Sequence, residues 1–486
     1  MFSKLEKLVF LALIFFIPIQ KRIFLFGPPE FFEWNSGFFY FTDFLAIAHI
    51  VLWLKSVYPK FNFGLKYKAT FTPIFLLFIF LGLAFISLTQ AELISVGLYR
   101  FVKLGEFIFL FFYVGARART IGVRTILQVF IASGVFQSIL AILQFAKQSS
   151  LGLEIFHEST IQIGMKGVAQ INAGGLDMIR AYGTFPSPNV LAGFLGICLL
   201  FAFLLFLNGW GRQYYFLAHS RSDCSRTCEA RPPQGAGSNP PENNTASRWM
   251  SVFFEKYFIS LTIFILLLGL ILTFSRGVII FFMLINILFF AGIFLFKKFK
   301  KYKKAAILLL LLVVSCQLLV VALAWPEVSS RFLGSSIDEA AIQERLFFNE
   351  IGLNTVSQNY SHMLFGIGMG NFVNNFMHSM PGLPDYLYQP VHNIFILIAS
   401  ETGTLGLFAF ILFIALLIER AAKNFFTGTI QMQHGRVAFV CVYILLCAVA
   451  FMMLISMYDH YFWTIQQGSL MFWITLGLLA SNNNGV

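Results

Sequence analysis

The chain has 486 residues, of which 58% are hydrophobic and only 12% are charged. Soluble domains carry about a quarter of charged residues, so this composition excludes an ordinary soluble protein and predicts a membrane protein. The net charge of +12 is explained by basic residues that flank membrane spans on the cytoplasmic side and contact anionic lipids. We therefore expect membrane lipids, and no nucleic acid, among the partners.

Apolar runs recur along nearly the whole sequence. A helix needs about 20 such residues to cross roughly 30 Å of hydrocarbon. By this criterion we predict an all-α polytopic membrane protein, in which residues 1–486 form a single membrane domain with about twelve spans. The first run lacks a small-residue cleavage site, so we expect a retained helix there rather than a removed signal peptide. The predicted spans are 6–20, 37–54, 70–88, 99–115, 125–146, 187–208, 258–275, 277–296, 305–324, 392–418, 437–457 and 462–480.

A run of six lysines within Lys297–Lys304 directly follows the eighth predicted span. Basic loops stay in the cytoplasm, so this loop fixes the orientation. Alternation of the spans from that point puts both termini in the cytoplasm, together with most of the 34 lysines and arginines.

Two long segments then lie outside, residues 147–186 and 325–391. Loops of this length in a compact protein are usually functional or disordered. In the second loop, Ser336-Ile337-Asp338-Glu339 is typical of a helix start. We predict short amphipathic helices against the membrane domain there, because apolar residues follow at roughly helical spacing, namely Ile342, Leu346, Phe347, Ile351 and Leu353.

The cytoplasmic segment 209–256 is rich in Ser, Pro, Asn, Gly and Arg and has no apolar period. This composition predicts a flexible loop. We find no internal sequence repeat, which disfavours transporter folds that are built from inverted repeats.

Two arginines reach the outer face. Arg276 lies between the seventh and eighth spans, where almost no loop separates them, and Arg180 lies before the sixth span. A charge at the membrane interface is a functional hypothesis by default; the alternative is an arginine that snorkels and only marks the boundary. For Arg180 the alternatives are a structural residue at a helix end and a fork that holds a phosphate through two hydrogen bonds.

His392 opens the tenth span. Its ordinary pKa near 6.5 suits proton abstraction at neutral pH, so it is a candidate general base; the alternative is a polar cap of the span. Asp459 and His460 link the last two spans, and we interpret them as turn residues. Glu401 follows His392 by roughly 13 Å along the helix, where we expect a buried packing or hydrogen-bonding group.

The glycine-rich segment Gly366–Asn371 lacks the context of a nucleotide-binding fold. We expect a tight turn whose backbone amides face an anion. Cys224, Cys228 and His219 offer at most three zinc ligands with no fourth, and the sequence has no Asp-x-Asp motif. We therefore expect neither a metal nor another cofactor.

Two arginines and a histidine at one membrane interface suit a lipid-linked diphosphate substrate. The lipid would stay in the bilayer, the arginines would stabilise the departing diphosphate, and the histidine would activate an acceptor hydroxyl.

At these residues the chain resembles the O-antigen ligase and O-antigen polymerase family of bacterial membrane glycosyltransferases. The similar motifs run in family order from about residue 170 to residue 480. They are Arg180-x-x-Gly183-Thr184-Phe185-x-x-Pro188-Asn189, Thr273-x-Ser275-Arg276-Gly277, Arg345 followed by Gly366–Phe372, His392-Asn393 with Glu401-x-Gly403-x-x-Gly406, and Asp459-His460-x-x-Trp463.

The resemblance implies a metal-independent, inverting transfer of a glycan from undecaprenyl diphosphate, on the periplasmic side of the inner membrane. The acceptor would be a lipid A core sugar, another lipid-linked glycan or a protein hydroxyl. The family roles fall on His392 as the base and on Arg180 and Arg276 as diphosphate ligands. The supporting residues would be Arg345, Asn393, Glu401, Asp459 and His460.

Several alternatives stay open at this point. The motifs do not separate a ligase from a polymerase, and they identify neither the sugar, the acceptor nor the oligomeric state. A small-anion secondary transporter is the competing class, although its polar residues should lie near the bilayer midplane rather than at the outer rim. A third interpretation is a scaffold in a polysaccharide export complex.

Overall fold

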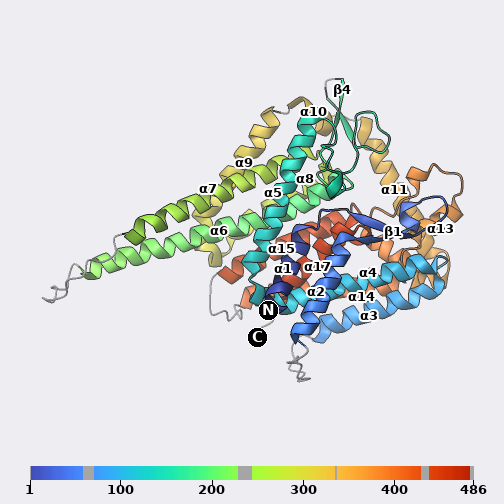
Figure 1. Cartoon of the computed structure of the whole chain (residues 1–486), viewed down its shortest axis with the longest axis horizontal. Helices are drawn as coiled ribbons and strands as arrows, with labels where there is room; N and C mark the ends of the chain where they lie inside the picture. Colours follow the sequence, from blue (N-terminus) through green and yellow to red (C-terminus); the bar gives the residue numbers. More distant parts are fainter. Residues whose placement is uncertain are drawn as a thin grey trace.

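The computed structural model describes residues 2–57, 71–173, 175–227, 243–323, 325–333, 336–427 and 437–481. Within these residues the chain is a bundle of long helices with two small β-hairpins (Figure 1). This architecture confirms the predicted all-α class.

Each of the twelve predicted spans overlaps one long helix or its end. Seven helices of the described residues are long and apolar enough by themselves to cross a membrane, and residues Tyr257–Leu272, the last part of α7 (Asn243–Leu272), form a shorter apolar stretch. The membrane class is therefore confirmed, while the count of about twelve spans stays a prediction. The long helices are α1 (Phe2–Phe15), α2 (Phe41–Val57), α3 (Phe71–Ser87), α4 (Ile94–Ile121), α5 (Val123–Lys147), α6 (Pro188–Thr227), α7 (Asn243–Leu272), α8 (Arg276–Leu295), α9 (Lys303–Leu323), α14 (Ile394–Thr427), α15 (Val437–Ser456) and α17 (Gln466–Ser481).

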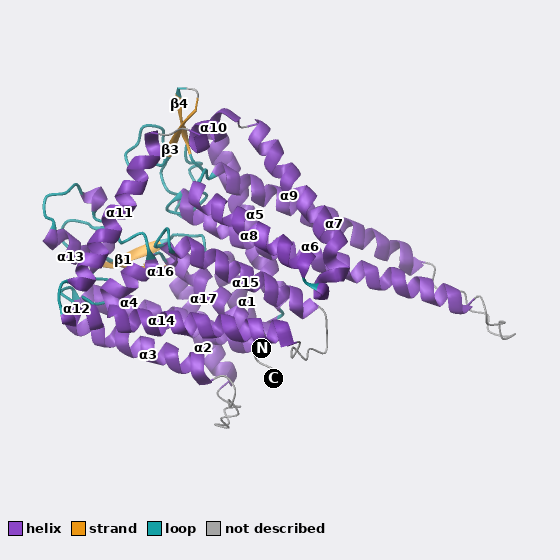
Figure 2. Ribbon diagram, turned by 180° about the vertical axis from the view of Figure 1, so that it is seen from behind, coloured by secondary structure: helices purple, strands orange, loops and turns teal. Residues whose placement is uncertain are grey.

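Short elements gather at one side of the bundle, beyond the ends of several long helices (Figure 2). Two antiparallel hairpins are among them, β1 with β2 and β3 with β4. The elements are β1 (Arg22–Phe26), β2 (Gly37–Tyr40), β3 (Gln170–Ala173), β4 (Leu176–Ile179), α10 (Trp325–Leu333), α11 (Ser336–Ser357), α12 (Tyr360–Phe365), α13 (Phe372–Ser379) and α16 (Tyr461–Thr464), with 3-10 turns at Glu33–Asn35, Leu88–Gln90, Glu154–Phe156 and Asp385–Leu387. A further 3-10 turn, Lys297–Tyr302, lies at the other end, where Lys298 Nζ donates to the backbone oxygen of Phe425 near the end of α14.

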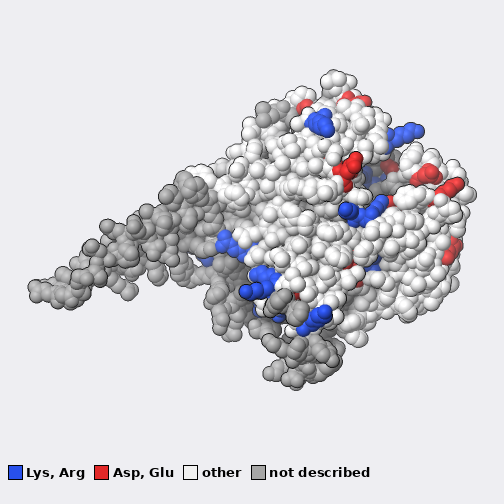
Figure 3. Space-filling view, in the orientation of Figure 1, with Lys and Arg blue, Asp and Glu red and all other residues white. Residues whose placement is uncertain are grey.

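The charged side chains are distributed unevenly between the two ends of the bundle. On the face shown in Figure 3, most acidic side chains lie at the end that carries the short elements, whereas the opposite end shows mainly lysine and arginine. A broad uncharged surface separates the two ends. This distribution agrees with the orientation expected from the loop charges, which itself stays a prediction.

The core runs through the middle of the bundle. The apolar stretch of α6, Pro188–Gly209, is 94% buried inside the molecule, whereas those of α3 and α9 are 33% buried. Helix α6 is therefore central, while α3 and α9 lie at the periphery, where their apolar side chains are available to lipid.

The structure corrects the boundaries of the predicted loop 209–256. Helix α6 continues to Thr227 and α7 begins at Asn243, so both ends of this segment are helical, and the two helices project together from the bundle (Figure 1). Polar side chains lower helix propensity only slightly, and a composition argument therefore missed these extensions. Residues 228–242 lie outside the described residues.

The predicted amphipathic helix of the second outer loop is present as α11, and it begins at Ser336 as expected. Its buried face agrees with the expected one in part, since Ile351 is buried as predicted and Phe347 packs half-buried against the same cluster. Phe348 and Ile351 are buried, and they pack in one cluster with Val391 and Leu397. By contrast, the predicted apolar positions Ile342, Leu346 and Leu353 are exposed.

The last predicted span, 462–480, is divided in the structure. Helix α16 ends at Thr464, and α17 begins at Gln466. Gly468 permits the sharp turn, since a Cβ atom there would overlap the carbonyl oxygen of Tyr461. The break holds the residues around Asp459 at the end of the bundle rather than inside a straight helix.

Candidate functional site

A cavity of about 580 Å³ lies at the end of the bundle that carries the short elements. Its walls come from the β1–β2 hairpin, α4, the segment before α6, α14 and the α16–α17 region. Four of the predicted site residues line it, namely His392, Glu401, Asp459 and His460.

His392, Asp459 and His460 lie together in the cavity wall. One nitrogen or carboxylate oxygen from each lies within 4.8 Å of the others. The two imidazole rings are 5.2 Å apart between centroids, and the ring of Phe348 packs 5.4 Å from that of His392. The Nδ1 atom of His392 is shielded from solvent and has no hydrogen-bond partner among the described residues. The structure thus brings the predicted base next to the two residues interpreted as turn residues.

Burial keeps both imidazoles neutral. It lowers the pKa of His392 below 6.5, and the nearby Asp459 carboxylate partly opposes this shift, while Arg345 adds to it. Burial also lowers the pKa of His460 to about 3, again opposed by Asp459. A neutral imidazole can accept a proton, so His392 is in the state that a general base requires.

Arg180 reaches this group through Asn189. Its Nε donates to the backbone oxygen of Thr273 at 2.7 Å, and its Nη2 donates to Asn189 Oδ1 at 3.0 Å. Asn189 Nδ2 in turn donates to Asp459 Oδ2 at 3.2 Å, and the Ser275 hydroxyl donates to Asn189 Oδ1 at 2.7 Å. A continuous chain of hydrogen bonds therefore links Arg180 to Asp459.

Arg276 and Arg345 form a second basic group beside the same residues. The guanidinium of Arg345 stacks over the Tyr458 ring, 4.2 Å from its centroid. Arg276, the first residue of α8, interacts electrostatically with both Arg345 and Tyr458. Two neighbouring guanidinium groups repel each other, and an anion bound between them would remove that repulsion. Neither arginine is among the residues that line the cavity, but Arg345 acts electrostatically on His392, which does line it.

Asn393 has a structural role at the start of α14. Its Oδ1 accepts hydrogen bonds from the backbone N–H groups of Phe395 at 2.9 Å and Ile396 at 3.3 Å. This is the geometry of a helix cap. The capping role considered for His392 therefore belongs to its neighbour, and the His392 imidazole is left for the cavity.

Glu401 is buried, as expected. Its Oε2 accepts a hydrogen bond from Trp463 Nε1 at 3.4 Å, and the backbone N–H groups of Gly370 and Phe372 also interact with its carboxylate. Gly403, two residues later, has φ +75° and interrupts the regular helix geometry of α14. A Cβ atom at Gly403 would overlap the backbone of Leu364, so α12 and α14 approach closely at this point.

The glycine-rich segment forms the predicted tight turn, with positive φ at Gly366, Gly368 and Gly370. Its amides, however, face groups of the protein. The N–H groups of Ile367 and Gly368 donate to the backbone oxygens of Ser400 and Glu401 at 2.9 and 3.1 Å. The segment therefore holds α14 in place, and the anion that its last amides face is the Glu401 carboxylate.

The donor set His392, Asp459 and His460 could hold a metal ion by its spacing. Several of its atoms already have other partners, however. Asp459 Oδ1 accepts from the backbone N–H of His460 and Oδ2 accepts from Asn189, while His460 Nδ1 lies 2.6 Å from the Thr464 hydroxyl. A metal ion would have to share or displace these hydrogen bonds.

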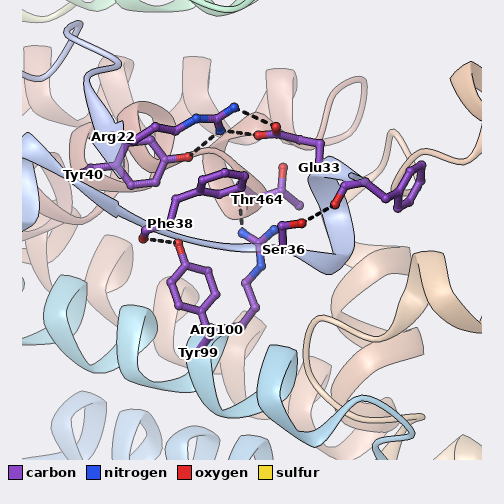
Figure 4. A network of polar contacts seen from close by, with 9 residues as sticks. Arg22, Glu33, Ser36, Phe38, Tyr40, Tyr99, Arg100 and Thr464 are labelled. Atoms are coloured by element: carbon purple, nitrogen blue, oxygen red, sulfur yellow. Dashed lines mark hydrogen bonds and ion pairs between the residues drawn. The ribbon is translucent and has the colours of Figure 1, made fainter. Parts of the chain in front are cut away.

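Sequence reasoning missed two features of the site. The first is Asn189, which appeared in a motif but was given no role. Its place directly after Pro-Ser-Pro, at the start of a predicted span, was a signal that its amide could form hydrogen bonds at the outer face. The first hairpin and α4 supply part of the cavity wall through Arg22, Phe38, Tyr99 and Arg100 (Figure 4). No motif marked these residues, because their proximity depends on helix packing.

The family model described as O-antigen ligase matches residues 261–411. The match covers α8, α9, the second outer loop and much of α14, and thus includes Arg276, Arg345 and His392. A comparison with curated proteins found no match. The family match confirms the resemblance seen in the sequence motifs and supports ligase-type or polymerase-type glycan transfer in a membrane.

Proposed function

We propose that this chain, which is similar to the O-antigen ligase family over residues 261–411, transfers a glycan from undecaprenyl diphosphate to an acceptor hydroxyl. The reaction takes place on the periplasmic side of the bacterial inner membrane, and both termini of the chain lie in the cytoplasm. The observation that carries the proposal is the convergence of His392, Asp459 and the hydrogen-bond chain from Arg180 at the wall of one cavity.

His392 is the general base in this proposal. The acceptor oxygen attacks the anomeric carbon of the donor sugar, and its proton passes to His392. The bond between the anomeric carbon and the diphosphate oxygen breaks, and the diphosphate leaves with the bonding electrons. Attack from the face opposite the leaving group inverts the anomeric configuration. The carboxylate of Asp459, within 4.8 Å, stabilises the imidazolium that forms.

Arg180, Arg276 and Arg345 bind the diphosphate. Negative charge grows on the leaving group during the reaction, and fixed positive groups that face it stabilise the transition state. The proximity of Arg276 and Arg345 supports this role, since like charges are placed together at a cost that a bound anion offsets. Arg180 is also linked to Asp459 by hydrogen bonds through Asn189, so the diphosphate ligand and the carboxylate beside His392 hold each other in position.

The cavity holds the acceptor. Its wall carries aromatic rings, among them Trp34 and Trp463, together with hydrogen-bonding groups. A concave site with apolar surfaces and a few fixed polar groups suits a small organic ligand, here a sugar of a lipid A core or of another glycan. His392 lines this cavity and interacts electrostatically with Arg345 of the basic group, so it adjoins both the acceptor and the diphosphate in this proposal.

The transfer is metal-independent in this proposal. Both carboxylate oxygens of Asp459 accept hydrogen bonds from protein groups, and these bonds orient the carboxylate without an ion. Activity should therefore persist after dialysis of the purified protein against EDTA. Loss of activity on chelation and recovery with one divalent ion would instead assign His392, Asp459 and His460 to a metal.

The decisive experiment profiles the glycans of cells that carry His392→Ala in place of the wild-type chain, at matched membrane levels. We expect loss of mature surface polysaccharide and accumulation of lipid-linked precursor. His378→Ala is a suitable control, since this exposed histidine contacts Glu92 and does not line the cavity.

The accumulated species identifies the reaction. Unlinked polymer would indicate a ligase, and single repeat units would indicate a polymerase. An unchanged profile in the His392→Ala cells would make His392 structural and would favour the small-anion transporter instead.

A further inference from the structure

Among the residues that the structure describes, three lysine or arginine side chains line the cavity, and two of them are paired with carboxylates. Arg22 makes a two-point ion pair with Glu33 (Figure 4), and Lys103 forms an ion pair with Asp43. Arg100 has no carboxylate partner within ion-pair distance among the described residues. Its one hydrogen bond given by the structure goes from Nη1 to the backbone oxygen of Thr464 at 2.8 Å.

The surrounding backbone fixes the side chain of Arg100. The residue lies in the second turn of α4, and Gly370 packs against its stem, so that a Cβ atom on this glycine would lie 2.6 Å from Arg100 Cγ. The Thr464 carbonyl holds the other end of the side chain. The guanidinium is therefore already held at the cavity wall. A ligand that binds it pays little entropy for ordering this side chain.

The Glu401 carboxylate does not neutralise Arg100 by contact. Glu401 also lines the cavity and interacts with Arg100 electrostatically, but the hydrogen bonds of its carboxylate go to Trp463 and to the backbone of the glycine-rich segment. The remaining N–H groups of the Arg100 fork are therefore not taken up by a described carboxylate. A guanidinium matches the geometry of carboxylate and phosphate groups.

Aromatic rings flank the same place. Tyr99, next to Arg100 in α4, has its ring 5.8 Å from the guanidinium carbon and is fixed by a hydrogen bond to the Phe38 backbone oxygen at 2.8 Å (Figure 4). Trp34 and Trp463 line the cavity as well. The wall therefore offers apolar ring surfaces for a sugar and one cation for a charged substituent.

We propose that the cavity selects an acidic glycan as acceptor, and that Arg100 binds its carboxylate or phosphate group. The inference rests on the proposed function and adds the chemical class of the acceptor. Arg100 is separate from the diphosphate ligands, because Arg180, Arg276 and Arg345 do not line the cavity. It also lies outside the segment that matches the family model.

A binding measurement tests this directly. Tryptophan fluorescence of the purified full chain in detergent reports on the cavity, since Trp34, Trp463 and Trp473 line it. The probes are glucose 6-phosphate, glucuronic acid and uncharged glucose. We expect the wild-type chain to bind at least one charged sugar roughly tenfold to a hundredfold more tightly than glucose, the range of a hydrogen bond to a charged group.

Variants identify the residue responsible. Arg100→Gln should bind the three sugars equally, and Arg100→Lys should keep part of the preference because it keeps the charge. Arg276→Gln should keep the whole preference, since it alters only the diphosphate site. The two charged probes separate a phosphate-bearing acceptor from a carboxylate-bearing one.

Two results would overturn the inference: an equal affinity of the wild-type chain for charged and uncharged sugars, or a preference that survives in Arg100→Gln. Loss of the preference in Arg276→Gln alone would assign it to the diphosphate site and would also contradict the role of Arg100. The measurement needs no transfer, so failure of the His392→Ala experiment would leave its outcome intact.

A kinetic measurement separates binding from a structural role. With an acceptor that carries the charged group, Arg100→Gln should raise the KM for the acceptor roughly tenfold or more. The KM for the lipid-linked donor should be unchanged. An equal fall of kcat with all acceptors, and no change in KM, would show that Arg100 only maintains the fold.

Discussion

Asn189 and Asp459 are 270 positions apart in the sequence, yet Asn189 Nδ2 donates a hydrogen bond to Asp459 Oδ2 at 3.2 Å. The same asparagine accepts from Arg180 and Ser275 through its Oδ1. One amide therefore joins the arginine that we propose as a diphosphate ligand to the carboxylate beside the proposed base.

Asn189→Asp should abolish most transfer activity. The substitution keeps the shape of the side chain but places an acceptor opposite Asp459 Oδ2, so two carboxylates face each other at a partly buried site. Loss of a buried hydrogen bond costs about 1–3 kcal/mol, and the repulsion adds to this. The measurement is kcat/KM for transfer by the purified variant, and we expect a fall of at least tenfold.

Asn172→Asp is the matched control. Asn172 Nδ2 also donates to an aspartate, Asp177 Oδ1 at 2.8 Å, but this pair is exposed in the β3–β4 hairpin. Solvent screens the two charges there, so activity should match that of the wild type. Equal effects of the two substitutions would contradict the role of Asn189.

Arg180→Lys should reduce kcat/KM for the lipid-linked donor by roughly tenfold to a hundredfold. Arg180 uses two different nitrogens to reach Thr273 and Asn189, and the single ammonium of lysine cannot replace this fork.

Arg276→Lys tests the same property at the second arginine and should also lose most activity. Arg119→Lys, at an exposed arginine of α4, serves as the control, and full activity of Arg276→Lys would exclude two-point binding of the diphosphate there.

The pH dependence of kcat/KM should reveal His392. Only the neutral imidazole accepts a proton, and burial lowers the pKa of His392 below 6.5, so activity should persist through pH 6.5 and decline at lower pH. The Asp459 carboxylate raises this pKa and Arg345 lowers it. Asp459→Asn should therefore move the decline to lower pH, and Arg345→Gln should move it to higher pH. Shifts of both variants in the same direction would contradict the assignment of this decline to His392.

Gly403→Ala should destabilise the fold. The residue has φ +75°, a conformation that costs non-glycine residues about 1–3 kcal/mol, and the added Cβ would overlap Leu364. Gly82→Ala in α3 is the control, because no atom lies within 4 Å of the Cβ that would be added. Removing a helical glycine there should stabilise the protein by roughly 0.5–1 kcal/mol. Thermal unfolding of the two purified variants in the same detergent distinguishes the effects.

The sequence predicted the helices of the membrane region well, because each apolar run has to be long enough to cross the bilayer by itself. It also predicted the start of α11 at Ser336, which depends on local helix-start residues. The buried face of α11 was predicted only in part. Ile351 is buried as expected, whereas Phe348 was missed because its burial depends on packing with Val391 and Leu397, which lie far along the chain.

The candidate site could be predicted in part for a similar reason. Arg180, Arg276 and His392 were evident because charged groups are rare next to apolar spans. The chain from Arg180 through Asn189 to Asp459, and the position of Arg100 in the cavity, depend on how α4, α6 and the segment after α15 pack together. No local pattern encodes such distances.

The cavity wall begins at Gln20 and ends at Trp473, so it includes residues from the first and the last parts of the chain. During synthesis, the N-terminal hairpin and the arginines emerge long before Asp459, His460 and the α17 residues that close the cavity. A partly synthesised chain in the membrane thus has neither the carboxylate beside His392 nor a closed acceptor site. In the proposed reaction, transfer therefore requires that the final helices have been inserted.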